Sequence, residues 1–514
     1  PTDHREADGL LPWAPPLLAV PALSPTPRNP TMERSNAHLQ QQLGKKDEQV
    51  TVSPTTTMDT LPLVSPPPSR ETLRETLPAA PAAPDDPVRR PTRRHRWLLW
   101  PLLAAVVAAL PLLPVEVWLP HMDLPSDDLS STADPLPPLI PADVPSFLNA
   151  TCLDSERRFP LVVTPVDPSV SIERVSEWVE RNRDIVTGWL DAYGAVLLRG
   201  FAVEEAAQFE RVAMAYTDRL DNIYLGTSPR EPVTNSEFVF TASEFESWKV
   251  VPMHCEMSFL PRPPEHLFFF AKEMPPDMVG GETPLVDMRA VAREMGEATR
   301  AVFERKGIRY VRAYPSARSS HPLDKYDPFK TKSYEAMFRH VPSAASDAAA
   351  VEAESRRQGF TPSWGPRGIL KLTHETPAFR THPRTGDEVW HNHLGVLHSA
   401  AWADEFAHAA RHLRSARYAA LSWLFYALDA LIHRGLFGEA FGQHVTHRGG
   451  EPIAAEHVWH VRRLMWKHTL TAPWRQGDII LVDNFRLAHA RMPFSTAGKR
   501  RLWAIWAKPP ASLE

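Results

Sequence analysis

Short apolar runs bounded by polar turn residues recur along the chain after residue 190 and are typical of buried β-strands. The clearest runs are residues 194–201, 267–270, 479–482 and 502–506. Gly477 and Asp478 mark a turn before the third run, and the polar Asp483-Asn484 pair ends it and begins a loop. The pattern predicts a domain that is mainly β.

Residues 402–437 follow a helical rhythm instead, and residues 421–432 within them are nearly apolar throughout. A helix that is apolar on all sides is usually buried. We therefore expect one helix here, packed against the strands. A helix lying in a membrane surface is the alternative interpretation. The predicted domain is thus mainly β with flanking helices.

The start of the chain has a different composition, because more than half of its 53 prolines lie in residues 1–150. Proline-rich sequence of low complexity buries too little apolar surface to fold. We expect residues 1–96 to be a disordered region and residues 120–155 to be a linker. The folded part is then a single domain, residues 156–510.

Residues 97–119 interrupt this region with an apolar segment that has tryptophans near both ends and arginines before it. A membrane span requires ~20 apolar residues. We expect a single-pass transmembrane helix, and the positive-inside rule then places the folded domain on the non-cytosolic side, in an endomembrane lumen or an organelle. The alternatives are a targeting sequence of a soluble organelle enzyme and a buried helix of a soluble protein.

Charge and cysteine content narrow the possible partners. The net charge is −4, and no basic patch is interleaved with aromatic residues, so the sequence argues against a nucleic-acid partner. The chain has only two cysteines, Cys152 and Cys255, which excludes a disulfide framework. A small molecule is the expected partner.

The triplet His254-Cys255-Glu256 carries the clearest candidate chemistry. Side chains alternate along an extended segment, so the imidazole and the carboxylate project to the same side while the cysteine points away into packing. Two such groups can be neighbouring ligands of one metal ion. A distant histidine would complete the two-histidine, one-carboxylate face of non-haem Fe(II) oxygenases, and His489, just beyond Asp483-Asn484, is the best candidate. A polar strand edge without a metal is the alternative.

Two arginines, Arg500 and Arg501, come directly before the apolar run 502–506. An arginine at the head of a buried strand needs an anionic partner, and its planar fork matches a carboxylate. Neighbouring strand residues face opposite sides, so one of the two arginines faces solvent.

These motifs, in this order and spacing, resemble the TauD/TfdA family, the taurine dioxygenase-like and clavaminate synthase-like Fe(II)/2-oxoglutarate oxygenases. The resemblance covers roughly residues 160–508 and rests on residues 194–201, 252–258, 267–270, 280–285, 483–489 and 493–501. It implies a double-stranded β-helix, or jelly roll, with the metal and the cosubstrate inside its mouth.

The resemblance also implies roles for particular residues. His254, Glu256 and His489 match the iron ligands. Thr283 matches the threonine whose hydroxyl contacts 2-oxoglutarate. The second arginine of the family's pair usually binds the distal carboxylate of 2-oxoglutarate, so we expect Arg501 in this role, with the preceding Arg500 as the alternative.

Asn392 lies in a histidine-rich stretch, His391-Asn392-His393, with His398 nearby. The resemblance suggests that Asn392 and its neighbours line the substrate pocket. A second metal site and an ordinary polar loop are the alternatives.

The implied reaction uses Fe(II), 2-oxoglutarate and O2 to hydroxylate or desaturate a small molecule, with an amino-acid derivative as one candidate. Halogenases of the family lack the carboxylate ligand, so Glu256 argues against halogenation. Two other functions stay open: a catalytically silent, membrane-tethered jelly-roll binding protein, and a metal hydrolase on the same barrel.

Overall fold

The computed structural model describes residues 136–513, except residues 227, 229, 243–244, 322–331 and 434–442. The expected disordered region 1–96 and the expected transmembrane helix 97–119 lie outside the described residues, so both stay predictions from the sequence. Among the helices that the structure describes, none is both long enough and apolar enough to cross a membrane.

The fold begins before residue 156. β1 (Leu148–Asp154) pairs with β2 (Phe159–Pro165) in antiparallel fashion. Leu148, Ala150 and Cys152 are buried and alternate with exposed positions, as expected of a strand with one covered face. The predicted linker 120–155 is therefore wrong at its C-terminal end. The short alternation of β1 directly follows proline-rich sequence, and the prediction assigns both to the linker.

A large sheet has the strand order β1-β2-β3-β17-β7-β20-β4, with β5 also paired to β20. The strands beyond the first pair are β3 (Ala195–Leu198), β17 (Ile479–Asp483), β7 (His266–Glu273), β20 (Arg501–Ala507), β4 (Leu220–Asp221) and β5 (Phe240–Thr241). Its centre, β3-β17-β7-β20, consists of the apolar runs predicted from the sequence, which are confirmed as strands.

A second sheet has the order β16-β9-β18-β6. Its strands are β16 (Thr469–Leu470), β9 (Leu285–Asp287), β18 (Leu487–Arg491) and β6 (Val251–His254), and the short pair β8 (Val279–Gly280) and β19 (Phe494–Ser495) lies nearby in sequence. Leu197, Phe269 and Ile480 of the large sheet share one apolar core cluster with Met253 and Ala488 of the second. The two sheets therefore enclose a common interior.

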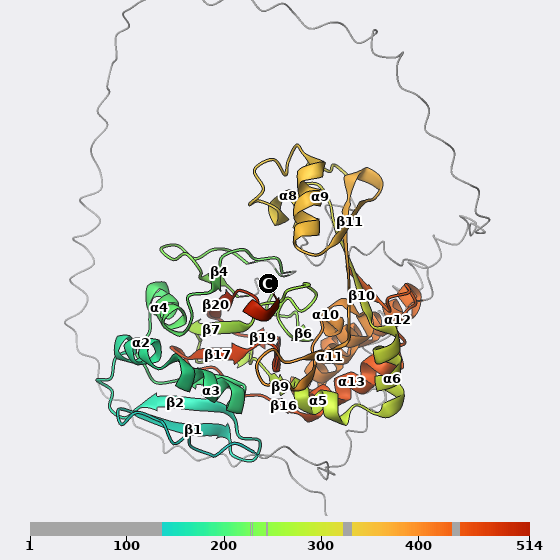
Figure 1. Cartoon of the computed structure of the whole chain (residues 1–514). Coiled ribbons are helices and arrows are strands. Elements are labelled where there is room, and N and C mark those ends of the chain that lie inside the picture. Colours follow the sequence, from blue (N-terminus) through green and yellow to red (C-terminus); the bar gives the residue numbers. More distant parts are fainter. Residues whose placement is uncertain are drawn as a thin grey trace, which may run out of the picture. The chain divides into compact units, whose positions relative to one another are not determined.

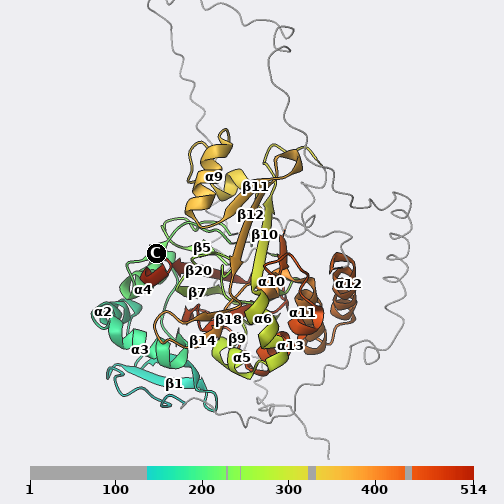
Figure 2. The same ribbon diagram turned by 45° about the vertical axis from the view of Figure 1, so that its right-hand side comes forward.

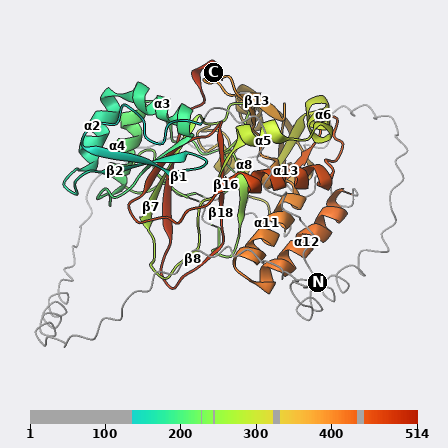
Figure 3. The same cartoon turned by 90° about the horizontal axis from the view of Figure 1, so that it is seen from below.

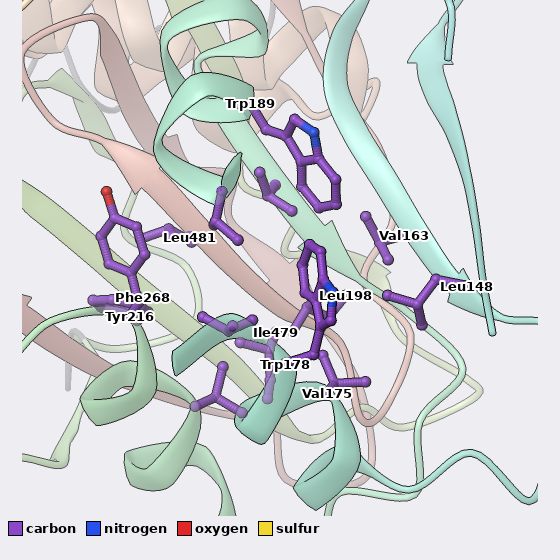
Figure 4. Close-up of a pocket in the computed structure, with 14 residues that line it drawn as sticks. Leu148, Val163, Val175, Trp178, Trp189, Leu198, Tyr216, Phe268, Ile479 and Leu481 are labelled. Carbon is purple, nitrogen blue, oxygen red and sulfur yellow. The ribbon is translucent and has the colours of Figure 1, made fainter. Parts of the chain in front are cut away.

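The opposite face of the large sheet is covered by α2 (Ile172–Arg181), α3 (Arg183–Tyr193) and α4 (Ala206–Tyr216), coloured cyan to green in Figure 1 and seen from below in Figure 3. Figure 4 shows the pocket at this contact, where Trp178 and Trp189 stack with ring centroids 5.5 Å apart. Its lining is almost entirely apolar and includes Phe268 and Leu481 of the sheet. This pocket belongs to helix–sheet packing and lies on the other side of the sheet from the enclosed interior.

Further helices lie beside the second sheet (Figure 2). They are α5 (Met288–Glu294), α6 (Glu297–Lys306), α10 (Leu394–Leu397), α11 (Ser399–His412), α12 (Ala416–His433) and α13 (Ala455–Lys467). The single helix predicted for residues 402–437 is wrong, because the chain turns at Arg414, where φ is 47°. α11 packs against β6, whereas α12 packs against α11 and leaves Tyr426 exposed.

An additional sheet has the order β11-β12-β10-β15, and its β11 end lies in a projecting arm with α8 (Tyr334–Met337) and α9 (Ala348–Arg357), drawn in gold in Figure 1. Its strands are β10 (Ile308–Tyr314), β11 (Thr361–Trp364), β12 (Leu370–Thr376) and β15 (Gln443–Thr446). The hairpin β13 (Phe379–Thr381) and β14 (Glu388–Trp390) follows β12. Helices and strands are thus mixed throughout, and the expectation of a mainly β domain understates the helices.

Candidate metal and cosubstrate site

The three predicted metal ligands meet in the interior between the two sheets. β18 pairs with β6 so that His489 stands directly opposite His254. Glu256 follows β6, and its Oε2 lies 3.7 Å from Nε2 of each histidine. All three side chains are buried, and one ligand atom from each lies within 4.8 Å of the others. In the described part of the chain, no other group of His, Cys, Asp or Glu side chains has this arrangement.

The protonation states of these residues suit a divalent metal. Nδ1 of His254 lies 2.8 Å from the carbonyl oxygen of Pro252 and donates to it, which leaves Nε2 free to bind a metal. Burial, with His254 nearby, lowers the pKa of His489 to about 4, so its imidazole is neutral. Burial by itself would raise the pKa of Glu256, but Arg230 and both histidines hold it well below its usual value. The site presents two imidazole nitrogens and one carboxylate as donor atoms for a divalent metal.

The geometry fits an iron ion. Metal–ligand bonds of about 2.1 Å place neighbouring donor atoms roughly 3 Å apart, so the 3.7 Å separations need only a small contraction. Because His254, Glu256 and His489 come from adjacent segments, they can occupy one face of the ion and leave the other face for ligands. Cys255 is fully buried in the shared core, as its place between two metal-facing residues predicted.

Asn484 fixes the position of the carboxylate ligand. Its Oδ1 accepts a hydrogen bond from the Glu256 amide at 2.7 Å, and its Nδ2 donates to the carbonyl oxygens of Glu256 at 3.0 Å and Pro264 at 2.8 Å. Asp483 beside it holds the turn through the amides of Phe485 and Arg486. The sequence identified this pair only as the end of a strand, whereas the structure shows that it connects the two halves of the metal site.

Replacing Asn484 by alanine is expected to lower the free energy of unfolding by about 2–4 kcal/mol, because two buried backbone groups of Glu256 lose their partners. Metal affinity should fall as well, since Glu256 is no longer held in place. Urea unfolding and metal titration measure the two effects. The exposed Asn149 provides a control, and Asn149→Ala should change stability by less than about 0.5 kcal/mol. Equal effects of the two substitutions would contradict this role of Asn484.

Arg230 is a site residue that sequence reasoning missed. Its Nη2 lies 2.8 Å from Oε2 of Glu256, and its guanidinium lies over the ring of Tyr224. The hydroxyl of Tyr224 donates to the other carboxylate oxygen, Oε1, at 3.3 Å. Both residues come from the irregular segment between β4 and β5, which has no periodic pattern that could place them. Glu256 is therefore bound at both of its oxygens by protein groups.

The two candidate arginines point in different directions. On β20, Leu502 and Ala504 face the shared interior. Arg501 leaves 51% of its side chain exposed and pairs with Glu273, also exposed, at 3.3 Å. Arg500 turns inward, and its Nε and Nη2 donate to the carbonyl oxygen of Gly281 at 3.1 and 2.8 Å. The position of Arg501 on the surface argues against the preference for it, and the inward direction of Arg500 favours the alternative.

The environment of Arg500 resembles an anion site. Burial and the nearby Arg491 lower the pKa of Arg500 to about 9, although Glu282 acts in the opposite direction. Thr283 lies in the same turn region, two residues after Gly281, and its hydroxyl accepts a hydrogen bond from Nε1 of Trp474 at 2.9 Å. Leu285 of the next strand pairs with His489, so this turn leads directly to the metal site.

The side chain of Asn392 contacts the backbone of neighbouring segments. Its Nδ2 donates to the carbonyl oxygen of Ala378 and its Oδ1 accepts from the amide of Leu394, each at 3.1 Å, so the amide is used in the fold. The prediction that Asn392 lines the substrate pocket is therefore not supported by its contacts. Its neighbour His393 approaches the site instead, with its ring edge-on to His254 and the centroids 5.1 Å apart.

Comparison with known proteins agrees with this geometry. Residues 159–506 match the family model described as "Taurine catabolism dioxygenase TauD, TfdA family", and the chain belongs to this family. The protein is therefore an Fe(II)- and 2-oxoglutarate-dependent oxygenase that uses O2. The class of enzyme and the cofactors predicted from the sequence are confirmed.

Individual relatives are distant in sequence. The chain is 27% identical over 305 residues to the dapdiamide synthesis protein DdaC of Enterobacter agglomerans, covering 59% of this chain and 80% of that protein. It is 25% identical over 346 residues to a clavaminate synthase-like protein of Arabidopsis thaliana, and the match covers 65% of this chain and 90% of that protein. Among solved structures, the PvcB protein of Pseudomonas aeruginosa is 16% identical, covers 71% of this chain and 94% of its own, and has a TM-score of 0.39.

Proposed function

We propose that this enzyme couples the oxidation of 2-oxoglutarate to succinate and CO2 with hydroxylation or desaturation of a C–H bond in a small molecule. The observation that supports this most directly is the pairing of His489 with His254, with Glu256 at 3.7 Å from both. We also interpret the two sheets that share the interior as the walls of a double-stranded β-helix. When bound, iron and 2-oxoglutarate supply the oxidising power for C–H cleavage.

The protein residues bind and orient. His254, Glu256 and His489 hold the iron, and Asn484 keeps Glu256 in place. The inward direction of Arg500 and its position beside the Thr283 turn support Arg500, rather than Arg501, as the residue that binds the distal carboxylate of 2-oxoglutarate. A carboxylate there would give this buried guanidinium the anionic partner that the carbonyl of Gly281 only partly replaces.

The three-ligand set supports oxygenation over halogenation. A halide would need the ligand position that Glu256 occupies, and this carboxylate is held by Arg230, Tyr224 and the backbone contacts of Asn484. Such a firmly bound carboxylate is not readily displaced. The product should therefore carry a new hydroxyl group or a new double bond.

The test is succinate formation by the purified chain. We expect 2-oxoglutarate to be converted to succinate only when Fe(II) and O2 are both present, slowly without substrate, and not after chelation of the metal. If the protein binds metal and has a hydrolytic activity that does not depend on 2-oxoglutarate or O2, the metal hydrolase is favoured. Absence of both metal binding and turnover would favour the silent binding protein.

A further inference from the structure

Arg312, on β10, is a buried cation that faces no carboxylate among the residues that the structure describes. Its side chain is only 1% exposed. Nη1 and Nη2 both reach the carbonyl oxygen of Leu225 at a long 3.3 Å, and Nε has no hydrogen-bond partner in the described part of the chain. Its guanidinium otherwise lies over the ring of Phe259, 3.7 Å from the centroid. A buried charge without a counter-ion is unfavourable, so its presence requires a reason.

The equally buried Arg462 on α13 provides a comparison, because it does have acidic partners. Arg462 is also 1% exposed, but it forms ion pairs with Asp404, at 2.9 Å, and with Glu405. Arg462 is therefore neutralised by two carboxylates of the protein, whereas Arg312 pairs with none among the described residues. Among the residues that the structure describes, Arg312 has no matching acidic side chain, which points to a ligand.

Two lines of contact connect Arg312 with the metal ligands. On one side, Phe259 packs edge-on against His393, with centroids 4.9 Å apart, and the ring of His393 meets that of His254 at 5.1 Å. On the other side, Leu225, which accepts from Arg312, follows Tyr224 in the chain, and the Tyr224 hydroxyl donates to Glu256. On the first route the side chains of Phe259 and His393 separate Arg312 from His254, and on the second Tyr224 separates Leu225 from Glu256.

The groups around Arg312 also suit an anion. Tyr314 lies two residues further along β10, on the same side of the strand, with its ring centroid 5.1 Å from the guanidinium carbon. Its hydroxyl is buried and has no hydrogen-bond partner in the described ranges. Two further cations lie over the ring of Tyr224. Cζ of Arg230 is 4.7 Å and Nζ of Lys332 is 5.2 Å from the ring centroid. The acid that pairs with Arg230 is Glu256, which is also the expected metal ligand.

We propose that Arg312 binds a carboxylate of the substrate, with the Tyr314 hydroxyl as a second donor, so that the substrate is a small carboxylic acid such as an amino acid. This proposal rests on the proposed function for the role of the metal site. A carboxylate presents two oxygens in one plane, which matches the free Nε edge of a guanidinium. The other carboxylate in the reaction belongs to 2-oxoglutarate, which the proposed function assigns to Arg500 and Thr283. Arg500 contacts the carbonyl oxygen of Gly281, whereas Arg312 contacts that of Leu225.

The first part of the test compares unfolding temperatures in the absence of metal and substrate. Arg312→Met should unfold at the same temperature as the unaltered protein or at a higher one, because it removes an unpaired buried charge and keeps the volume. The matched control, Arg462→Met, should unfold at a clearly lower temperature, because it leaves two buried carboxylates unpaired. If Arg312→Met is destabilised as much as Arg462→Met, Arg312 is a structural residue and the proposal is wrong.

The second part measures ligand binding by thermal shift on the full chain loaded with Mn(II). The probes are L-alanine, L-leucine, L-phenylalanine, hexanoate and 3-phenylpropionate, each beside its carboxamide, and 2-oxoglutarate. At least one carboxylate should raise the unfolding temperature while its carboxamide does not. Arg312→Met should weaken that binding on the order of 100-fold, as removal of one partner of a buried charge pair does, and Arg500→Met should weaken 2-oxoglutarate binding instead.

Two results would overturn the assignment: no probe carboxylate binds the unaltered protein, or Arg312→Met weakens 2-oxoglutarate binding while Arg500→Met does not. Arg312→Lys provides a second variant, and it should recover only part of the binding because an ammonium lacks the planar fork. None of these measurements depends on turnover. A failure of the succinate test would therefore concern the proposed function, whereas a failure here would concern Arg312 alone.

Discussion

Replacing Glu256 by alanine is expected to abolish substrate oxidation and to lower the free energy of unfolding of the metal-free protein by about 3–5 kcal/mol. The first effect follows from the loss of the single carboxylate ligand. The second follows because Arg230, buried and paired with Glu256 at 2.8 Å, is left without a counter-ion. Product formation, bound iron and urea unfolding measure these effects separately.

Glu256→Gln is the matched control for this experiment. Its side-chain oxygen can still accept from Arg230 and its shape is unchanged, so we expect a smaller loss of stability than in Glu256→Ala, with activity still lost. Glu256→Gln removes only the negative charge that the metal needs, whereas Glu256→Ala also removes the contact with Arg230 that stabilises the fold. Full activity in Glu256→Ala would exclude the three-residue metal site.

Replacing Arg500 by alanine is expected to raise the KM for 2-oxoglutarate on the order of 100-fold, or about 2.7 kcal/mol at 1.36 kcal/mol per tenfold change. The guanidinium of Arg500 is turned inward, and its hydrogen-bond acceptor among the described residues is the carbonyl oxygen of Gly281. Initial rates of succinate formation over a range of 2-oxoglutarate concentrations give this value.

Arg501→Ala serves as the neighbouring control. Its ion pair with Glu273 joins two exposed side chains, and such surface pairs contribute only about 0–1 kcal/mol. We expect the KM for 2-oxoglutarate to stay within about twofold of the original value, which corresponds to less than 1 kcal/mol. A large effect of Arg501→Ala with a small effect of Arg500→Ala would reverse the assignment.

The parts of the fold that the sequence predicts are those with a local signal. The runs that form β7, β17 and β20 are apolar and bounded by turn residues, so their strand character is visible without the fold. The metal triplet is equally local, because alternation along an extended segment already places His254 and Glu256 on one side. His489 was identified by its position after a strand and a polar loop.

The parts that the sequence does not predict depend on contacts between distant segments. Arg230 lies in an irregular segment, and its role appears only when that segment folds over Glu256. Alternation places Arg309 and Arg312 on opposite sides of β10, but the sequence does not show which side is covered: Arg309 is partly buried, whereas Arg312 is fully enclosed. The choice between Arg500 and Arg501 depended on which side of β20 faces the interior, and this requires knowing what packs on each side.

The contact between Asn484 and Glu256 has a consequence for the order of events during synthesis. These residues are 228 positions apart in the chain, and His489 comes later still. When Glu256 leaves the ribosome, the strand that carries His489 and the strands β17 and β20 that flank β7 have not been made. Because such long-range pairings form only once both partners are present, the proposed metal site can be completed only in a nearly finished chain, and a nascent chain that ends before residue 484 lacks both Asn484 and His489.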